Sequence, residues 1–394
     1  MSKSNLLESG IEKLSKLNHR LTDYFVERED VIHTSILALI SRQHHLQIGP
    51  PGTAKSAIAT AICKAINGAR IFDVLMTRSM DPSELLGPYS LKSMEDDDFK
   101  RVTNGFAPEG DILFLDELYR ANDPILNSLL WILNERKIRN GKEVSTVPLI
   151  CMFSGTNALY EGSSLDALHS RITFRLPVSF VTEKDNFVAM IENSLSNGAG
   201  PHVEDIGLTI KELEAVQAQV DSVKVPKAIY ADALWAIRSE LKQHEVYLDD
   251  RKAVWLMKTV VRSEAIFQGR DTVEVEDLNI LTHCLWDTEA QITPIRHTIN
   301  RIASPVMDEA QRYIESAGKA TSGAFAKKRD MNNADSPEVQ AAFLDANKEL
   351  KGILAKLQDR INETSGKSQT YLKGAQRKAQ NYHKRILEGM GVSL

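Results

Sequence analysis

Eight consecutive residues form a pattern suited to holding phosphate groups. They read Gly49-Pro50-Pro51-Gly52-Thr53-Ala54-Lys55-Ser56, between a short strand pattern at 45–48 and a helical pattern at 55–66. Glycines let the main chain approach a phosphate closely, and N–H groups at a helix start attract anions. In such a loop Lys55 reaches the β- and γ-phosphates and Ser56 ligates Mg²⁺. The alternative is a chance turn. Glycine usually precedes the lysine, but we expect Ala54 to tolerate the helical conformation required there.

A second candidate element is an apolar run, 112–115, that ends in Asp116 and Glu117. Adjacent carboxylates at the end of a buried strand repel each other and lose hydration, so a bound cation would explain them. We expect Asp116 to hold Mg²⁺ and Glu117 to orient and activate an attacking water. The alternative, that the acids merely open a loop, is disfavoured because Lys55 and Ser56 lie upstream.

Composition excludes several classes of protein. The chain has 394 residues, more than one core usually organises, and a net charge of −5 that does not favour general binding to nucleic acid or anionic membrane. No apolar run approaches a membrane span, and the first residues lack a signal-peptide core. The three cysteines, Cys63, Cys151 and Cys284, are far apart among apolar neighbours. We expect them to be buried thiols in a reducing cytoplasm, with no metal or redox role.

The first half of the chain alternates strands with helices, which predicts a parallel sheet with helices on both faces. A polar stretch at 82–110 is interpreted as an irregular or inserted segment, and Asn140-Gly141 as the turn of a hairpin. The expected strands are 45–48, 71–75, 112–115, 149–153 and 172–176.

The second half contains helical periodicities. Residues 205–285 show no strand pattern, and 288–317 continue as helix. The small and polar segment 318–336 predicts a linker. Beyond it, apolar residues spaced by three and four over 339–361 indicate a coiled-coil-like seam, and a basic helix follows at 368–389.

Four motifs occur in the order of an AAA+ module: GPPGTAKS at 49–56, ILFLDE at 112–117, SGTN at 154–157 and LDALHSR at 165–171. Three longer segments resemble the MoxR branch of AAA+ ATPases, and within it the RavA group: 75–93, 127–141 and 163–176. The resemblance weakens over the last hundred residues. It implies an α/β AAA+ P-loop domain at 1–190, an all-α lid at 200–288 and a C-terminal helical bundle at 289–394, the last including the linker at 318–336.

The resemblance also implies roles for further residues. Asn157 matches sensor 1, which helps position water near the γ-phosphate; the alternative is a turn residue. Arg171 matches the arginine finger that reaches a neighbouring subunit's nucleotide, with Arg175 as the second choice. Arg251 matches sensor 2, although a surface arginine beside the helix cap Asp249 is the alternative. The segment 26–32 lies where the family approaches adenine, and the preference for ATP over GTP rests on this likeness alone.

A finger supplied by a neighbour implies a closed homo-oligomeric ring, expected to be hexameric. Members of this branch act as chaperone-like remodellers of protein clients, often with a von Willebrand factor A domain partner. Two inserts mark the branch, near 85–106 and at 136–148, and in such rings both face the channel. Lys137, Arg139 and Lys142 are candidate client contacts; the alternative is a solvated hairpin.

Two other functions stay open from the sequence. One is a motor or switch in nucleic-acid restriction or repair, which the absence of a recognisable DNA-binding motif disfavours. The other is a scaffold that binds nucleotide without hydrolysis, disfavoured because Lys55, Asp116, Glu117 and Asn157 are all present. The basic last helix lacks the aromatic ladder typical of nucleic-acid contacts, which favours a solvated face. Longer RavA-like chains insert a partly β domain where this chain has only 318–336, so partners of that domain are not transferred.

Overall fold

The structure is a computed structural model that describes residues 3–159, 165–196, 200–330, 336–364 and 366–391. The chain divides into two compact units, Met1–Ile292 and Thr293–Leu394. Each unit is described by itself.

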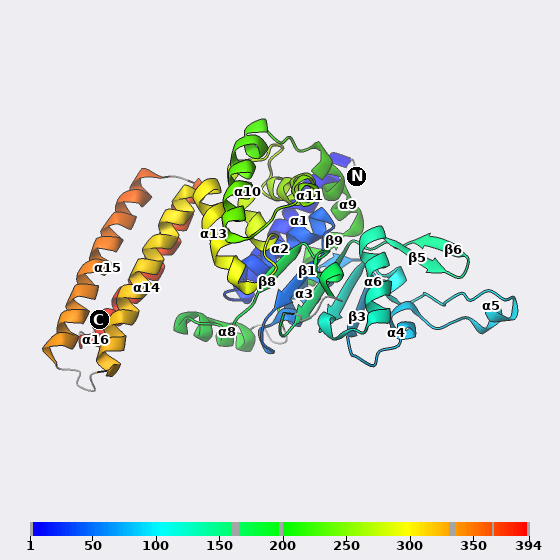
Figure 1. Cartoon of the computed structure of the whole chain (residues 1–394), viewed down its shortest axis with the longest axis horizontal. Coiled ribbons are helices and arrows are strands. Elements are labelled where there is room, and N and C mark those ends of the chain that lie inside the picture. Colours follow the sequence, from blue (N-terminus) through cyan, green and yellow to red (C-terminus); the bar gives the residue numbers. More distant parts are fainter. Residues whose placement is uncertain (1–2, 160–164, 197–199, 331–335, 365, 392–394) are drawn as a thin grey trace. The chain divides into compact units, whose positions relative to one another are not determined.

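A five-stranded parallel sheet forms the centre of the first unit, in the order β3-β4-β7-β1-β8 (Figure 1). The carboxyl ends of parallel strands meet at one edge of a sheet, so the segments that follow β1, β4 and β7 lie together. The strands are β1 (His45–Ile48), β3 (Ile71–Leu75), β4 (Ile112–Asp116), β7 (Cys151–Thr156) and β8 (Phe174–Pro177). This confirms the predicted α/β class.

β7 begins and ends later than the predicted strand at 149–153. Ser154, Gly155 and Thr156 suggest a turn by residue type, yet they continue the strand because both neighbours are strands: Gly155 pairs with Asp116 of β4, and Thr156 pairs with Ile48 of β1. All six residues of β7 are buried.

Helices flank the sheet on both sides: α1 (Lys3–Tyr24), α2 (Glu29–Ser41), α3 (Lys55–Lys64) and α6 (Asp123–Glu135). The buried surfaces of α2 and α3 are Ile-, Leu- and Ala-rich, which fits a helix packed on a parallel sheet. Cys63, Cys151 and Cys284 are buried free thiols, and burial raises the pKa of Cys63 and of Cys284 to about 12. The expected burial of the three thiols is thus observed.

Two insertions lie side by side and form what we call the arm, residues 82–106 together with 137–146 (Figure 1). The predicted hairpin is confirmed as β5 (Lys137–Asn140) and β6 (Glu143–Thr146), and the segment before it holds two short helices, α4 (Pro82–Leu86) and α5 (Leu91–Glu95). Asn140 joins the two pieces: its Oδ1 accepts from the Arg101 N–H at 2.6 Å and its Nδ2 donates to the Arg101 carbonyl at 3.1 Å.

Among the residues described after β8 the regular structure is helical, as predicted, apart from one short parallel strand pair and an isolated bridge between Lys224 and Thr272. β9 (Leu208–Thr209) pairs with β2 (Ile66–Asn67), a two-residue contact too short to leave a period in the sequence. The main helices are α8 (Lys184–Ser196), α9 (Ile210–Gln219), α10 (Trp235–Leu241), α11 (Asp250–Leu256) and α12 (Arg262–Phe267). π-helical turns, Ile229–Leu234 and Met257–Val261, precede α10 and α12.

α13 (Glu289–Ala303) spans the boundary between the units, and three packed helices follow it: α14 (Pro305–Asp330), α15 (Pro337–Glu363) and α16 (Gly366–Gly389). The predicted seam of α15 is confirmed, because every one of its seven apolar positions is buried. The single helix predicted at 288–317 is instead two helices, interrupted at Ser304-Pro305.

The linker predicted at 318–336 is wrong over 318–330, where α14 continues as helix. Ala317 and Ala324 are buried in the helical core, and Gly318 lies against the Tyr382 ring. Small residues here allow close helix contact, and this packing outweighs their weak helix propensity. Residues 331–335 of the predicted linker lie outside the described part of the chain. Across the helices that the structure describes, none is long and apolar enough to cross a membrane.

Candidate active site

The loop at 49–56 joins β1 to α3 at the carboxyl edge of the sheet. A side chain at Gly49 is impossible, since its Cβ would lie 1.9 Å from the Val178 carbonyl oxygen. Gly52 adopts a left-handed φ of 83°, which glycine takes without strain. The two predicted glycines are therefore both required by the backbone of this loop.

Lys55 lies across the mouth of the loop. Its Nζ donates to the carbonyls of Gly49 at 2.6 Å and Pro50 at 3.0 Å, and to the Asn157 Oδ1 at 3.3 Å. Burial lowers the pKa of Lys55, while the nearby Asp116 and Glu117 carboxylates oppose that shift. The structure thus brings together the lysine, the predicted sensor 1 and both acids.

Asp116 ends β4 and lies directly beside Gly155 of β7. A Cβ on Gly155 would be 2.8 Å from the Asp116 Oδ1 and 3.4 Å from the Lys55 Cε, so no larger residue fits between these side chains. The same carboxylate accepts the Glu117 N–H at 3.1 Å. These contacts fix the orientation of Asp116 toward Lys55.

Glu117 has a left-handed backbone, φ 54° and ψ 44°, which is unusual for a residue with a side chain. Its carboxylate accepts a short hydrogen bond from the Asn157 Nδ2 and forms a 3.4 Å ion pair with the Arg120 Nε. Strained conformations of this kind concentrate at functional sites. Asn157 therefore contacts both Lys55 and Glu117.

Ala54 differs from the conformation predicted for it. Its φ of 67° and ψ of 18° are left-handed, not helical. A side chain costs roughly 1–2 kcal/mol in this region, so glycine is usual at this position of the loop for a conformational reason.

We expect Ala54→Gly to raise the free energy of unfolding by ~1 kcal/mol, because relief of the left-handed strain exceeds the added chain entropy of glycine. Denaturant unfolding measures this. The control is Ala57→Gly, three residues on in the regular turns of α3, which should lower the same free energy by about 1 kcal/mol. An equal loss of unfolding free energy in both variants would contradict left-handed strain at Ala54.

The residues predicted to hold Mg²⁺ fit a metal that arrives with phosphate. Ser56 is exposed in the first turn of α3, and Asp116 is half-buried at the end of β4. Among the described residues no group of three or more His, Cys, Asp or Glu forms a metal cage. Mg²⁺ in nucleotide sites takes one or two protein oxygens and fills its shell with phosphate and water, so a hydroxyl and one carboxylate suffice.

Arg171 and Arg251 are both exposed, and no hydrogen bond or ion pair of the described residues joins either side chain to Asp116 or Glu117. Arg171 is exposed just after α7 (Asp166–His169), and Arg251 is exposed in the first turn of α11. Asp249 caps the main chain of α11 through the Lys252 N–H at 2.8 Å. The chain itself thus brings four predicted residues together and leaves two arginines outside.

Arg175 is buried, with 1% of its side chain exposed, and links β8 to the end of the helical region. It forms a 2.9 Å ion pair with Asp287 and donates to the Cys284 carbonyl at 2.9 Å. This inward position favours Arg171 over Arg175 as the residue that reaches a neighbour.

We expect Arg175→Met to lower the free energy of unfolding by about 1–2 kcal/mol, because a buried hydrogen bond is lost while the half-exposed Asp287 stays hydrated. Denaturant unfolding checks this. ATP turnover per folded molecule should change little. A large loss of turnover at full stability would assign Arg175 the finger role instead.

Sequence reasoning missed Arg28, a buried residue whose guanidinium reaches the loop at the Thr53 carbonyl. It lies within the segment 26–32, yet no local spacing marks it, since its partner is 25 positions away.

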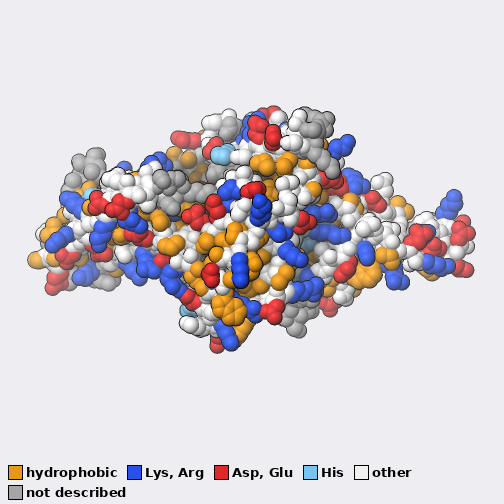
Figure 2. Space-filling model, turned by 90° about the horizontal axis from the view of Figure 1, so that it is seen from above, with side chains coloured by type: hydrophobic (Ala, Val, Ile, Leu, Met, Phe, Trp, Pro, Cys, Tyr) orange, Lys and Arg blue, Asp and Glu red, His pale blue; other side chains and the backbone are white. Residues whose placement is uncertain are grey.

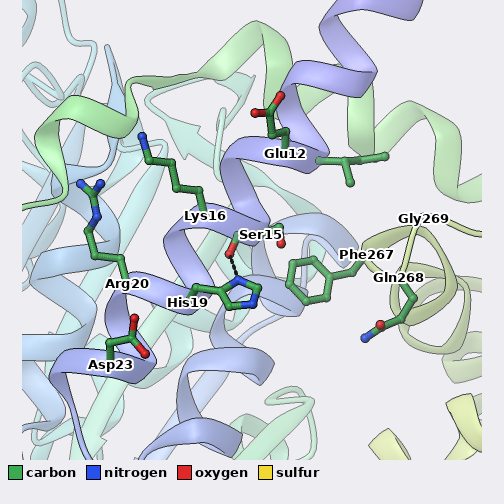
Figure 3. A pocket seen from close by; sticks show the side chains of 10 residues that line it. Glu12, Ser15, Lys16, His19, Arg20, Asp23, Phe267, Gln268 and Gly269 are labelled. Atoms are coloured by element: carbon green, nitrogen blue, oxygen red, sulfur yellow. Dashed lines mark hydrogen bonds between the residues drawn. The ribbon is translucent and has the colours of Figure 1, made fainter. Parts of the chain in front are cut away.

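A surface cavity of about 690 Å³ lies between α1 and the end of α12 (Figure 3). Lys16, His19 and Arg20 line it, and none of the loop residues does, so we do not assign the chemistry to this cavity.

Comparison with known proteins agrees with this fold. A family model described as the MoxR domain in the MoxR-vWA-beta-propeller ternary systems matches residues 12–218, and a AAA lid domain model matches residues 230–299. Two uncharacterised proteins of Methanocaldococcus jannaschii are 36% and 33% identical; the matches cover 76% and 74% of this chain and 78% and 76% of theirs. A putative ATPase from Cytophaga hutchinsonii has a similar fold, with a TM-score of 0.60 at 17% identity, over 76% of this chain and 96% of that one.

The fold and the loop define a P-loop protein of the AAA+ class. The first model covers more than half of the chain, and this protein belongs to the MoxR family of AAA+ ATPases. Membership implies nucleotide binding.

Proposed function

We propose that this protein hydrolyses ATP with Mg²⁺ as a ring of identical subunits, and that hydrolysis remodels or activates a protein client. The observation that carries the proposal is the convergence of Lys55, Asp116, Glu117 and Asn157 at one edge of the sheet, with Arg171 exposed elsewhere. A complete phosphate site that lacks its arginine is what a ring ATPase requires, because the neighbour supplies that charge.

Each residue has a separate task in this scheme. The loop from Gly49 to Ser56 offers main-chain N–H groups to the phosphates, and Lys55 moves from the loop carbonyls to the β- and γ-phosphate oxygens. Ser56 and Asp116 hold Mg²⁺. Glu117 takes up a proton from the attacking water, and Asn157 orients that water together with the Glu117 carboxylate.

Three further roles rest on family likeness. Arg171 stabilises transition-state charge on a neighbour's γ-phosphate, Arg251 contacts the phosphates from the lid, and the segment 26–32 holds adenine. The domain boundaries 1–190, 200–288 and 289–394 are part of the same proposal, as is the closer relation to the RavA group.

An exposed apolar surface on α8 supports assembly. No residue of this helix is buried in the single chain, and Phe187, Ile191 and Leu195 are each more than two-fifths exposed. Monomeric proteins rarely expose such continuous apolar patches. Burial of this helix between subunits of a hexameric ring accounts for it.

The partner proposal follows from the matched family, whose systems include a von Willebrand factor A protein and a beta-propeller protein.

The arm offers a surface for a client. Leu91 and Phe99 are exposed on it at 81% and 59%, and its hairpin carries the exposed Lys137, Arg139 and Lys142. Figure 2 shows acidic and basic side chains together at the end of the arm. Such a mixed surface suits contacts that form and break during a cycle.

ATP turnover measured against protein concentration, with the assembly mass determined in parallel, tests the proposal. Specific activity should rise as the ring forms, because the monomer lacks a neighbour's Arg171. Full activity in a dilute monomer would contradict the ring mechanism. Stimulation by DNA would point instead to a nucleic-acid motor, which no feature of the described structure favours.

A further inference from the structure

Arg28 is a buried cation that donates to three main-chain carbonyls within the described part of the chain. Arg28 is the residue directly before α2, and it is 7% exposed. Nη2 donates to the Ser179 carbonyl at 2.6 Å, Nη1 to the Glu27 carbonyl at 2.7 Å, and Nε to the Thr53 carbonyl at 3.3 Å. One guanidinium therefore joins the phosphate loop, the segment after β8 and the start of α2.

The backbone of Arg28 is itself fixed from the other side. Glu27 has a left-handed φ of 58°, and its carboxylate accepts from the N–H groups of Thr182 and Glu183 at 3.1 Å each and from the Asn186 Nδ2 at 2.9 Å. Thr182 and Glu183 directly precede α8, and Asn186 lies in its first turn. Burial lowers the pKa of Arg28, and the Glu27 and Glu29 carboxylates oppose this, so the group keeps its charge.

An anion-binding loop requires a particular orientation of its peptides. N–H groups must point toward the phosphates, so the carbonyls must point away and find other donors. The Thr53 hydroxyl supplies one for the Pro50 carbonyl at 2.9 Å, and Arg28 supplies one for the Thr53 carbonyl. A Thr53 carbonyl turned inward would face the phosphates with a negative dipole and weaken their binding.

We propose that Arg28 is a positioning residue for the phosphate loop, holding the Thr53 peptide with its carbonyl outward so that the loop is preformed for nucleotide. The inference rests on the proposed ATP binding and adds a residue to it. Arg28 acts through the loop backbone and touches no reacting atom.

The test compares Arg28→Met and Arg28→Lys with a matched control, Arg136→Met. Arg136 is half-buried, and it likewise donates to three main-chain carbonyls, those of Leu133, Arg42 and Ile150, at 3.3, 2.8 and 3.2 Å. Arg42 and Ile150 precede β1 and β7, so this arginine serves the amino edge of the sheet, opposite the loop. For each variant the dissociation constant of a fluorescent ATP analogue, kcat, KM and the unfolding midpoint are measured on the full-length chain.

We expect Arg28→Met to weaken nucleotide binding and raise KM by about tenfold or more, with a smaller change in kcat, since hydrogen bonds to charged groups are the strong ones. Arg28→Lys keeps the charge but cannot reach three carbonyls, so it should recover part of the affinity. Arg136→Met should lower the unfolding midpoint and leave nucleotide affinity unchanged.

Equal nucleotide affinity in wild type and Arg28→Met would overturn the inference, as would an equal loss in Arg136→Met. If Arg28→Met does not fold, Arg28→Lys decides: unchanged affinity contradicts the role, and weakened affinity at an unchanged unfolding midpoint supports it. Lys55→Ala tests the proposed ATP binding independently of Arg28, because it removes the side chain that contacts the phosphates and leaves Arg28 in place. Should wild type itself fail to bind the analogue, the proposed ATP binding fails and not merely the role of Arg28.

Discussion

Replacing Glu117 by glutamine is expected to slow ATP turnover by about 10²–10⁴-fold while ATP still binds. Glutamine has the same shape, and its Oε1 can still accept the hydrogen bond that Asn157 donates to Glu117. It cannot take a proton from water. The loop and Lys55 are untouched, so nucleotide affinity should stay within a few-fold of wild type. Steady-state turnover and a separate equilibrium binding measurement give the two numbers.

The control for this variant is Glu135→Gln, which removes an exposed carboxylate at the end of α6. It should turn over ATP like wild type. If Glu117→Gln and Glu135→Gln behave alike, Glu117 is not the base, and the left-handed backbone at this position needs another explanation. A loss of binding together with turnover would indicate a role in holding the nucleotide.

The second large effect is expected for Arg171→Ala, which should reduce turnover by ~10³–10⁵-fold, as loss of an arginine finger does in other nucleotide hydrolases. The assembly mass should not change, because Arg171 is exposed and its main-chain N–H bond to Leu168 is kept. Turnover and mass are measured on the same sample. A fully active Arg171→Ala ring would remove this residue from the mechanism.

The nucleotide loop and the sheet could be predicted from the sequence because their signals are local. The strands at 45–48 and 112–115 are buried, and they lead directly into the glycine loop and the two acids, while 71–75 is a partly exposed strand at the edge of the sheet. Lys55 and Glu117 therefore lie where motif spacing predicts them. Parallel pairing then brings Asn157 to the same edge.

Features that depend on distant contacts could not be predicted in this way. The helix at 318–330 forms because its alanines pack against α15 and α16, whereas its amino-acid composition alone suggests a linker. Ala54 is left-handed because the loop geometry demands it, although alanine alone favours a helix. The proposed role of Arg28 depends on its hydrogen bonds to Thr53 and Ser179, which are 25 and 151 positions away in the sequence.

Complementation between two inactive variants tests most directly whether the active site is shared by neighbouring subunits. Glu117→Gln and Arg171→Ala chains are mixed in equal amounts as monomers, assembled together, and assayed for ATP turnover. A competent site needs its own Glu117 and a neighbour's Arg171, so random assembly leaves about one interface in four intact. Turnover near a quarter of wild type is the predicted result. A mixture as inactive as each variant alone would contradict the trans arrangement and, with it, the ring mechanism.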